Sequence, residues 1–422
     1  MAKHDAEDAH ALFSPSSGHK WLRCTGSLAM EDGLPNTTND AAEEGTAAHE
    51  LAAVTLTDGN YLCAAYEGRI FNKEWEATEE MCEYTQIYVD AIRARVDEYY
   101  TAGAVDVHLF VENRVDLSDV LGIPEQFGTS DAIFLVEWPN GEWLISVEDL
   151  KYGYRLVNAE DNEQLMLYAL AALDQYRTVG NFTRARMVIH QPRREHVSDW
   201  EISVEDLLAF GATAKLRAHA AHALIGKPKG SLLPHLTPGD KQCTYCKAAG
   251  SCPALGKFVE DQVGADFEDL TKESVESPPP VTYSGEDYAR DLAALPLVEL
   301  WCKRKLAAAE SFIFAGGEIP GWKIVAGKKG RRTWTDKKEA EQVLTSFRLR
   351  HEEMYDYKLI SPTTAEKLLA KASPRRWKKL INFITQKEGQ PSMAEIGDKR
   401  EPLALTKPED DFDMVTDGND MV

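Results

Sequence analysis

The stretch "SVEDLKYG", Ser146 to Gly153, places two acids and a lysine at the end of an apolar run. The residues before it, "EWLISV", predict a β-strand. Because side chains alternate across a strand, Asp149 and Lys151 share one face, whereas Glu148 points to the other. At this point two interpretations are open: a surface ion pair, or half of a metal-dependent phosphodiesterase site.

A second strand is predicted just before this one, in the apolar and β-branched stretch "FGTSDAIFLVEW". The "PNG" at 139–141 between the two strands has the chemistry of a hairpin turn. Asp131 and Asp149 are each about nine residues from the centre of that turn. We therefore expect the two carboxylates to lie opposite one another, where they could hold Mg²⁺, an ion that prefers oxygen ligands.

The surrounding sequence alternates helix and strand patterns. Helices are predicted over 39–56, 78–101 and 158–176, and further strands over 107–117 and 184–194. A sheet flanked by helices is an α/β core.

Composition limits the function classes. The net charge of −22 argues against nonspecific coating of nucleic acid, but it leaves room for a local basic channel. Apolar runs stay short of the roughly 20 residues that a membrane helix needs. The N-terminal "MAKHDAEDAHALF" has acids where a signal peptide has its apolar segment. We expect a cytoplasmic protein with no membrane span.

Three of the seven cysteines are clustered in "CTYCKAAGSC", which contains Cys243, Cys246 and Cys252. In a reducing compartment this spacing predicts a metal or iron–sulfur centre rather than disulfides. C-x2-C is equally a zinc half-site, and the residues themselves do not distinguish the two metals.

The strand pair and its neighbours resemble the PD-(D/E)xK nuclease superfamily, and in particular its RecB-like exonuclease branch. "GTSD" followed by "EDLK" matches the aspartate on one strand and the D/E-x-K on the next. His49 in "EEGTAAHELA" matches a histidine on a preceding helix, and Gln164 and Tyr168 in "EQLMLYALA" match a glutamine and a tyrosine on the following helix. The four matched elements stand in the expected order over residues 45–170.

The resemblance implies a restriction-endonuclease-like fold, with a mixed central sheet flanked by helices, and a Mg²⁺- or Mn²⁺-dependent deoxyribonuclease. The implied metal ligands are His49, Asp131, Asp149 and the main-chain carbonyl of Leu150. The implied catalytic residues are Asp131, Asp149, Lys151 and Gln164. Lys151 would orient water and neutralise charge on the phosphate. Gln164 would lie near the metal or the scissile phosphate, and Tyr168 near the nucleic acid.

Glu112 in "LFVENRV" could face the same site from the neighbouring strand. Glu112 is a weaker candidate for the site than the residues that the nuclease resemblance matches.

Several members of that branch hold a [4Fe–4S] cluster with one cysteine before the nuclease core and three after it. Cys24 in "WLRCTGS" and the triplet Cys243, Cys246 and Cys252 match this arrangement. Such a cluster would act as a clasp, because it closes a loop of more than two hundred residues. Zn²⁺ on the four thiolates is the alternative.

Basic runs suggest a path for DNA. The residues predicted to contact it after the core helix are Arg184, Arg186, Arg193 and Arg194. "CKRK" at 302–305, "KKGRR" at 328–332 and "RRWKKL" at 375–380 add positive charge, with Trp334 and Trp377 beside the last two. Cations with interleaved aromatic rings suit single-stranded nucleic acid. The alternative for each run is a solvated surface.

The length and a shift in composition predict four parts. They are a nuclease domain with its clasp at 1–265, a linker at 266–285, a smaller and mostly helical accessory region at 286–400, and an acidic, disordered tail at 401–422. Within the accessory region we expect helices over 288–315, 337–347 and 361–384 and a hairpin over 321–334.

The sequence therefore predicts a metal-dependent DNA exonuclease. Over most of its length the chain also resembles a family of phage and prophage proteins of unknown function. This implies phage recombination or replication in the cytoplasm of a bacterial host, beside a single-strand annealing or single-strand-binding protein. Two alternatives remain: a non-catalytic DNA-binding or assembly protein that keeps the nuclease fold, and a zinc-site scaffold with no nucleic-acid role.

Overall fold

The computed structural model describes residues 11–35, 40–72, 74–264, 284–322, 366–367, 369–371 and 373–380. The chain divides into two compact units, Met1–Val325 and Ala326–Val422. Helix α14, Pro374–Leu380, belongs to the second unit and contains Trp377. Several predictions lie outside the described residues: most of the linker, the hairpin from residue 323 onward, the helix at 337–347, the "KKGRR" run with Trp334, and the tail at 401–422.

The centre of the first unit is a five-stranded mixed sheet. Its strands are β3 (Asp106–Asp116), β4 (Phe127–Glu137), β5 (Glu142–Leu150), β6 (Asn181–Gln191) and β7 (His196–Ser203), in the spatial order β3-β4-β5-β6-β7. Neighbours are antiparallel except β5 and β6, which are parallel. A parallel pair needs a crossover, and α6, Glu163–Tyr176, supplies it. The mixed sheet with flanking helices confirms the predicted α/β class.

The β4–β5 hairpin sets the register of the sheet where its charged residues lie. Gly141 has φ +79°, in the region that favours glycine, and it donates its N–H to Trp138 O at 2.9 Å. The paired residues run from Glu137 and Trp143 to Ala132 and Glu148. One step further along each strand are Asp131 and Asp149, which therefore stand opposite one another.

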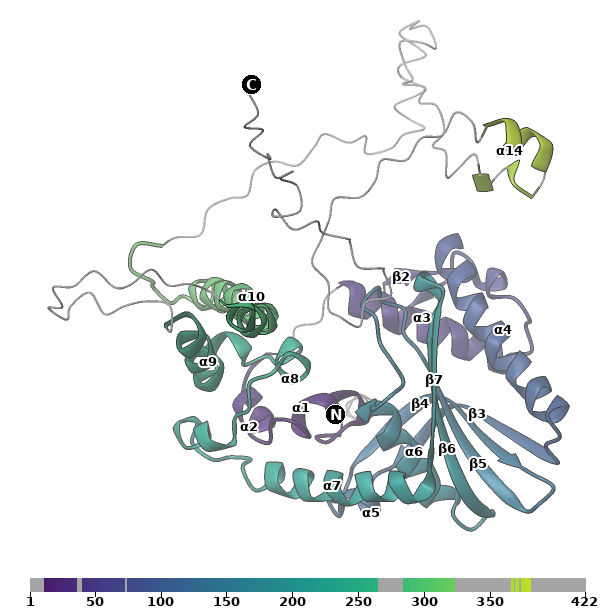
Figure 1. Ribbon diagram of the computed structural model, residues 1–422, viewed down its shortest axis with the longest axis horizontal. Coiled ribbons are helices and arrows are strands. Elements are labelled where there is room, and N and C mark those ends of the chain that lie inside the picture. Colours follow the sequence, from purple (N-terminus) through teal and green to yellow (C-terminus); the bar gives the residue numbers. More distant parts are fainter. Residues whose placement is uncertain are drawn as a thin grey trace, which may run out of the picture. The chain divides into compact units, whose positions relative to one another are not determined.

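Helices cover both faces of the sheet (Figure 1). On one face lie α3, Asp40–Thr57, and α4, Glu79–Thr101, packed over a core that includes Phe134, Val136 and Leu144. Thr78 caps α4 by accepting the N–H of Met81 at 3.2 Å, so the helix begins where its sequence predicts.

On the other face lie α6, α5 (Ser118–Leu121) and α7 (Val204–His222), over a core that includes Ile133, Ile145 and Val147. β7 and α7 do not correspond to any of the strands or helices predicted from the sequence. β7 is an edge strand in which half-buried and exposed residues alternate, and this pattern gives a weak apolar signal.

A third core lies around the cysteines. Its helices are α2 (Ser27–Glu31), α8 (Asp240–Thr244), α9 (Pro253–Gly264) and α10 (Gly285–Phe314). Leu297 of α10 is buried in it, and Arg304 Nη2 donates to Thr244 O at 2.5 Å. A Cβ on Gly250 would lie 2.3 Å from Arg304 O, so this close approach requires glycine. The helix predicted at 288–315 is therefore confirmed, and it packs on the cysteine segment within the first unit.

The N-terminal segment joins this third core through a buried ion pair. Lys20 Nζ lies 2.7 Å from Glu31 Oε2, and Glu31 Oε1 accepts the N–H of Lys247 at 2.8 Å. The segment around Cys24 is thereby fixed beside the cysteine triplet. Among the described residues, none of the helices has the length and apolar character needed to cross a membrane.

Candidate metal and catalytic site

Three side chains that could ligate a metal lie together, His49 from α3, Glu112 from β3 and Asp131 from β4. Atoms of His49, Glu112 and Asp131 lie within 4.8 Å of one another. His49 Nδ1 is 3.1 Å from Asp131 Oδ1. His49 is half-buried, whereas Glu112 is exposed. One imidazole nitrogen and two carboxylates in this arrangement are able to ligate a divalent cation.

The backbone of β3 changes conformation at Glu112. Its φ is +47°, in the left-handed region that non-glycine residues rarely adopt. Val111 pairs with Ala132 and Asn113 pairs with Ser130, but the ladder is interrupted between them. The interruption lies directly opposite Asp131, and strain of this kind is concentrated at functional sites.

A second group of contacts lies on β5 and α6. Lys151 Nζ is 2.7 Å from Asp149 Oδ2 and donates a hydrogen bond to Gln164 Oε1 at 3.0 Å. Gln164 Nε2 in turn donates to Asp149 Oδ1 at 3.1 Å. The three side chains close a ring in which each contacts the other two. Asp149 is 2% exposed, so both of its oxygens are held within the protein.

A main-chain contact joins the two groups. The N–H of Leu150, between Asp149 and Lys151, donates to Asp131 Oδ2 at 2.7 Å. Asp131 thus uses one oxygen for β5 and the other for His49. Of the predicted metal ligands, His49 and Asp131 lie in one possible ligand group, which also contains Glu112, whereas Asp149 lies outside that group and contacts Lys151 and Gln164.

In the group of His49, Glu112 and Asp131, the pKa values reflect two carboxyl groups beside one imidazole. Burial lowers the pKa of His49, but Asp131 outweighs burial and raises that pKa to about 9. Burial favours the neutral form of Asp131, yet its contacts with His49 and Lys151 keep its pKa below the ordinary value. The pKa of Glu112 rises to about 7, because its carboxyl group is partly desolvated, although the residue is exposed, and because Asp131 repels it.

In the second group, burial raises the pKa of Asp149, and the attraction of Lys151 offsets this only in part. Burial lowers the pKa of Lys151, but Asp149 and Asp131 outweigh it and raise that pKa above its ordinary value. Lys151 therefore carries its positive charge beside the acids.

Behind the site a buried charged network fixes β5 from the α4 side. Glu148 is fully buried and accepts Arg95 Nε at 2.8 Å, and its other oxygen lies 2.7 Å from His190 Nε2. The main-chain carbonyl of His190 accepts the N–H of Lys151 at 2.8 Å. Glu148 thus points away from Asp149, as the strand alternation predicts, and holds the backbone that carries the D-x-K residues.

Tyr168 lies one turn after Gln164 on α6, but its ring is 6% exposed and packs in the core beside Gly128. Burial raises the pKa of its hydroxyl. Stacking on a base would require this ring to leave the core.

The four arginines predicted to contact DNA are paired within the protein. Arg184 and Arg186 pair with Glu201 and Asp199 on β7. Arg184 is opposite Leu144, whereas Asp149 is opposite Ile189, so roughly 16 Å of strand separates Arg184 from the site.

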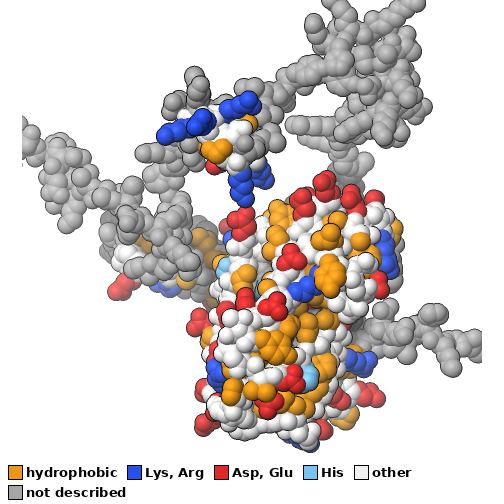
Figure 2. All heavy atoms as spheres, turned by 90° about the vertical axis from the view of Figure 1, so that its right-hand side faces the viewer, with side chains coloured by type: hydrophobic (Ala, Val, Ile, Leu, Met, Phe, Trp, Pro, Cys, Tyr) orange, Lys and Arg blue, Asp and Glu red, His pale blue; other side chains and the backbone are white. Residues whose placement is uncertain are grey.

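The other two arginines follow β6. Arg193 donates to Glu44 Oε2 at 2.9 Å and lies over the ring of Tyr152 at 3.9 Å. Arg194 donates to Tyr154 O at 2.6 Å. On the face of the first unit shown in Figure 2, basic, acidic and apolar side chains of the described residues are interspersed, without a continuous basic tract.

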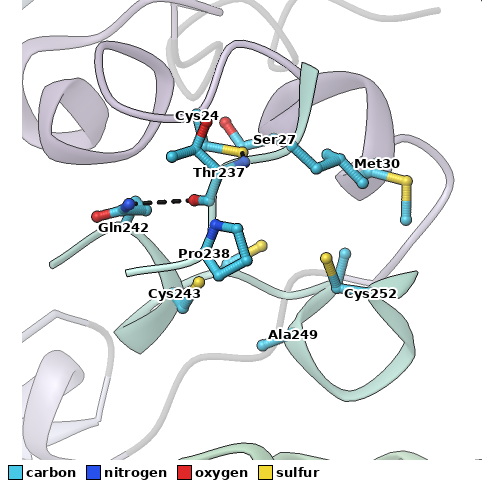
Figure 3. A pocket seen from close by; sticks show the side chains of 12 residues that line it. Cys24, Ser27, Met30, Thr237, Pro238, Gln242, Cys243, Ala249 and Cys252 are labelled. Atoms are coloured by element: carbon cyan, nitrogen blue, oxygen red, sulfur yellow. Dashed lines mark hydrogen bonds between the residues drawn. The ribbon is translucent and has the colours of Figure 1, made fainter. Parts of the chain in front are cut away.

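Four cysteines line one cavity, seen in Figure 3. They are Cys24 from the N-terminal segment and Cys243, Cys246 and Cys252 from the segment around α8 and η6 (Ala249–Ser251). Gln242 Nε2 donates to Thr237 O at 3.1 Å, and both residues line the cavity. The structure therefore gathers cysteines that are more than two hundred residues apart in the sequence.

Main-chain N–H groups point at two of the sulfurs. Thr237 N–H donates to Cys24 Sγ and Gly239 N–H donates to Cys243 Sγ, both at 3.4 Å. Burial raises the pKa of the Cys24 thiol and raises that of Cys243 to about 11. Thiolates in this cavity need a positive counter-charge, and N–H donors suit sulfurs that bear negative charge.

Comparisons with known proteins identify the family but not the activity. A family model described as "Protein of unknown function (DUF2800)" matches residues 10–401, so the chain belongs to that family. Among solved structures, one titled "Crystal structure of SSO0001" is similar, with 12% sequence identity, over 55% of this chain and 94% of the other. Its TM-score is 0.21, too low to support an argument about this chain.

Proposed function

We propose that this member of the DUF2800 family is a metal-dependent deoxyribonuclease that hydrolyses phosphodiester bonds at the site of Asp131, Asp149 and Lys151. The observation that carries the proposal is the chain of direct contacts from His49 through Asp131 and Leu150 to the Asp149–Lys151–Gln164 ring. An ordinary surface ion pair would not bring together polar groups from two helices and two strands in this way.

The donor set fits a divalent cation. Burial raises the pKa of Glu112, and repulsion by Asp131 raises it further. A cation between the two carboxylates would remove that repulsion. Two carboxylates suit Mg²⁺ or Mn²⁺, and the imidazole of His49 is compatible with Mn²⁺. When bound, such an ion supplies a Lewis acid that withdraws charge from the phosphodiester.

The protein's own residues provide the remaining functions. Lys151 is charged, partly exposed and held in one orientation by Asp149 and Gln164, so it can contact a phosphate oxygen as negative charge develops. We assign Asp149 to positioning Lys151 and, as the nuclease resemblance implies, to the cation. We assign Asp131 to the cation, with its orientation fixed by Leu150.

We also propose that the four cysteines of the cavity hold a [4Fe–4S] cluster. The preference for this cluster over Zn²⁺ rests on the resemblance to the RecB-like nucleases, because four thiolates suit either centre. The cofactor would tie the segment of Cys24 to the end of the core and thereby stabilise the domain.

The biological setting belongs to the proposal as well. By resemblance, the reaction is exonucleolytic and serves phage recombination or replication, with a single-strand annealing or single-strand-binding protein as partner. An uncleaved protein–DNA complex formed by the wild type with metal present would instead support the non-catalytic alternative.

The test uses the full chain, purified anaerobically, with end-labelled single- and double-stranded DNA in Mg²⁺, in Mn²⁺ or with a chelator. We expect degradation with either metal and none with the chelator. Asp149→Ala and Lys151→Ala should each abolish it while the circular dichroism and the visible absorption of the cluster stay unchanged. Full activity in both variants would overturn the site assignment, and a colourless protein that contains zinc would overturn the cluster.

A further inference from the structure

An exposed aromatic ring lies where the cysteine segment meets the loop that follows β5. Tyr245 stands between Cys243 and Cys246 in the sequence, yet its side chain is 58% exposed while both cysteines are buried. The guanidinium of Arg155 lies 5.8 Å from the centre of the ring, and His19 meets the ring edge-on at 5.6 Å. The ring is therefore supported at its edge and has a cation beside it.

The support from His19 is apolar in character. Burial, together with the neighbouring charge of Lys20, lowers the pKa of His19 to about 4, so the imidazole is neutral at neutral pH. Its edge-on contact with Tyr245 is an aromatic packing contact, which fixes the ring without adding a charge.

Hydrogen bonds from a buried side chain fix the backbone around Arg155, whereas its own side chain makes an exposed ion pair. Gln191 Nε2 donates to Arg155 O at 2.7 Å, and Gln191 Oε1 accepts the N–H of Val157 at 2.9 Å. The side chain of Arg155 is 53% exposed and lies 3.3 Å from the equally exposed Asp240. An exposed ion pair of this kind contributes little to stability. The guanidinium can therefore leave Asp240 and bind a phosphate with little loss of free energy.

Arg155 is close in the sequence to the proposed catalytic site. Arg155 follows Lys151 by four residues, in the loop that leaves β5. The guanidinium of Arg155 lies 5.8 Å from the centre of the Tyr245 ring and so places the ring beside the loop that carries Lys151. A nucleotide next to a phosphate at Lys151 therefore has an exposed ring and an exposed guanidinium within its reach.

We propose that Tyr245 and Arg155 form a subsite for an unpaired nucleotide of single-stranded DNA, with the base stacked on Tyr245 and its phosphate at Arg155. The inference rests on the proposed function, since it places this nucleotide beside the bond cleaved at Lys151. Stacking needs a free base face, and a base within a duplex has both faces covered by its neighbours. The subsite therefore gives the nuclease a preference for single-stranded ends.

Binding tests the subsite separately from catalysis. Fluorescence anisotropy with a labelled oligothymidylate and with a blunt duplex of equal length is measured on the full chain in a chelator, so that hydrolysis does not interfere. We expect Tyr245→Ala to weaken oligothymidylate binding by about tenfold or more, Tyr245→Phe to preserve it, and duplex binding to change much less. Tyr61→Ala is the matched control, because Tyr61 is also exposed beside an arginine, Arg93 at 5.0 Å, and lies beyond the end of α3.

Two outcomes would overturn the subsite: oligothymidylate binding by Tyr245→Ala that equals that of the wild type, or an equal loss in Tyr245→Phe. If Tyr245→Ala loses its visible absorption, Arg155→Ala decides the question, since its side chain is exposed. Removing one phosphate contact should lower the slope of log Kd against log salt by about 0.7 for the single strand, and an unchanged slope contradicts the proposal. A wild type that binds through Tyr245 but does not hydrolyse DNA refutes the nuclease and not the subsite.

Discussion

The main-chain N–H of Leu150 donates a hydrogen bond of 2.7 Å to Oδ2 of Asp131. Because Leu150 stands between Asp149 and Lys151, this bond fixes Asp131 relative to both of them. The remaining oxygen, Oδ1, is left to face His49. The geometry of the candidate site therefore follows from the register of the β4–β5 hairpin.

Glu112→Gln should weaken the binding of the divalent cation. The substitution keeps the shape of the side chain but removes one of the two carboxylates near His49. We expect the Mn²⁺ concentration that gives half-maximal DNA hydrolysis to rise by about tenfold or more. Glu83→Gln, at an exposed position of α4, is the control. An identical Mn²⁺ dependence in Glu112→Gln and the wild type would remove Glu112 from the site.

His49 should decide the choice between metals. An imidazole nitrogen favours Mn²⁺ over Mg²⁺, which prefers oxygen ligands. We expect the wild type to reach half-maximal hydrolysis at a lower concentration of Mn²⁺ than of Mg²⁺, and His49→Asp to reduce that difference. Metal titrations of initial rates on end-labelled DNA measure both quantities. If the half-maximal concentrations of Mg²⁺ and Mn²⁺ stand in the same ratio in His49→Asp as in the wild type, His49 does not contact the cation.

The sequence allows the prediction of Asp131 opposite Asp149, because a short turn at 139–141 connects their strands and short turns determine register. Glu112 was a weaker candidate for a physical reason. The connection between β3 and β4 contains α5 and has no tight turn, so the register of Glu112 against Asp131 could not be deduced, nor could its positive φ.

Other parts of the site depend on tertiary contacts that leave no recognisable pattern in the sequence near each residue. Glu148 belongs to a buried network with Arg95 and His190, which are distant in the sequence. The predicted DNA contacts at Arg184 and Arg193 rested on charge alone, and the structure pairs both arginines with acids. Charge runs in a sequence do not reveal their partners.

Arg95→Ala should destabilise the fold. The substitution removes a hydrogen-bonded partner of Glu148, which is fully buried, and leaves its charge poorly compensated. We expect the free energy of unfolding to fall by about 3 kcal/mol, measured by urea denaturation under circular dichroism. Arg177→Ala removes the exposed pair of Arg177 with Asp174 and should cost about 0.5 kcal/mol or less. Equal losses in the two variants would show that the Glu148 network contributes nothing beyond a surface pair.

Cys24→Ser should remove the cofactor even though Cys24 is far from the triplet in the sequence. All four cysteines line one cavity, so the loss of one thiolate leaves an incomplete ligand set. We expect about four iron atoms per chain in the wild type and a loss of iron and visible absorption in Cys24→Ser. Cys302→Ser is the control, because Cys302 is exposed and does not line the cavity. Full iron content in Cys24→Ser would exclude Cys24 as a ligand.

The most direct test of the catalytic site is the rate at which Asp131→Asn hydrolyses end-labelled DNA in saturating Mn²⁺. The asparagine retains an oxygen that can accept the Leu150 N–H, so the hairpin stays in place while the negative charge is lost. Asp116→Asn is matched to it, since Asp116 Oδ1 also accepts a main-chain N–H, that of Ser118, at 2.7 Å. We predict a fall of at least about 100-fold for Asp131→Asn and none for Asp116→Asn. Hydrolysis by Asp131→Asn at the wild-type rate would contradict the account.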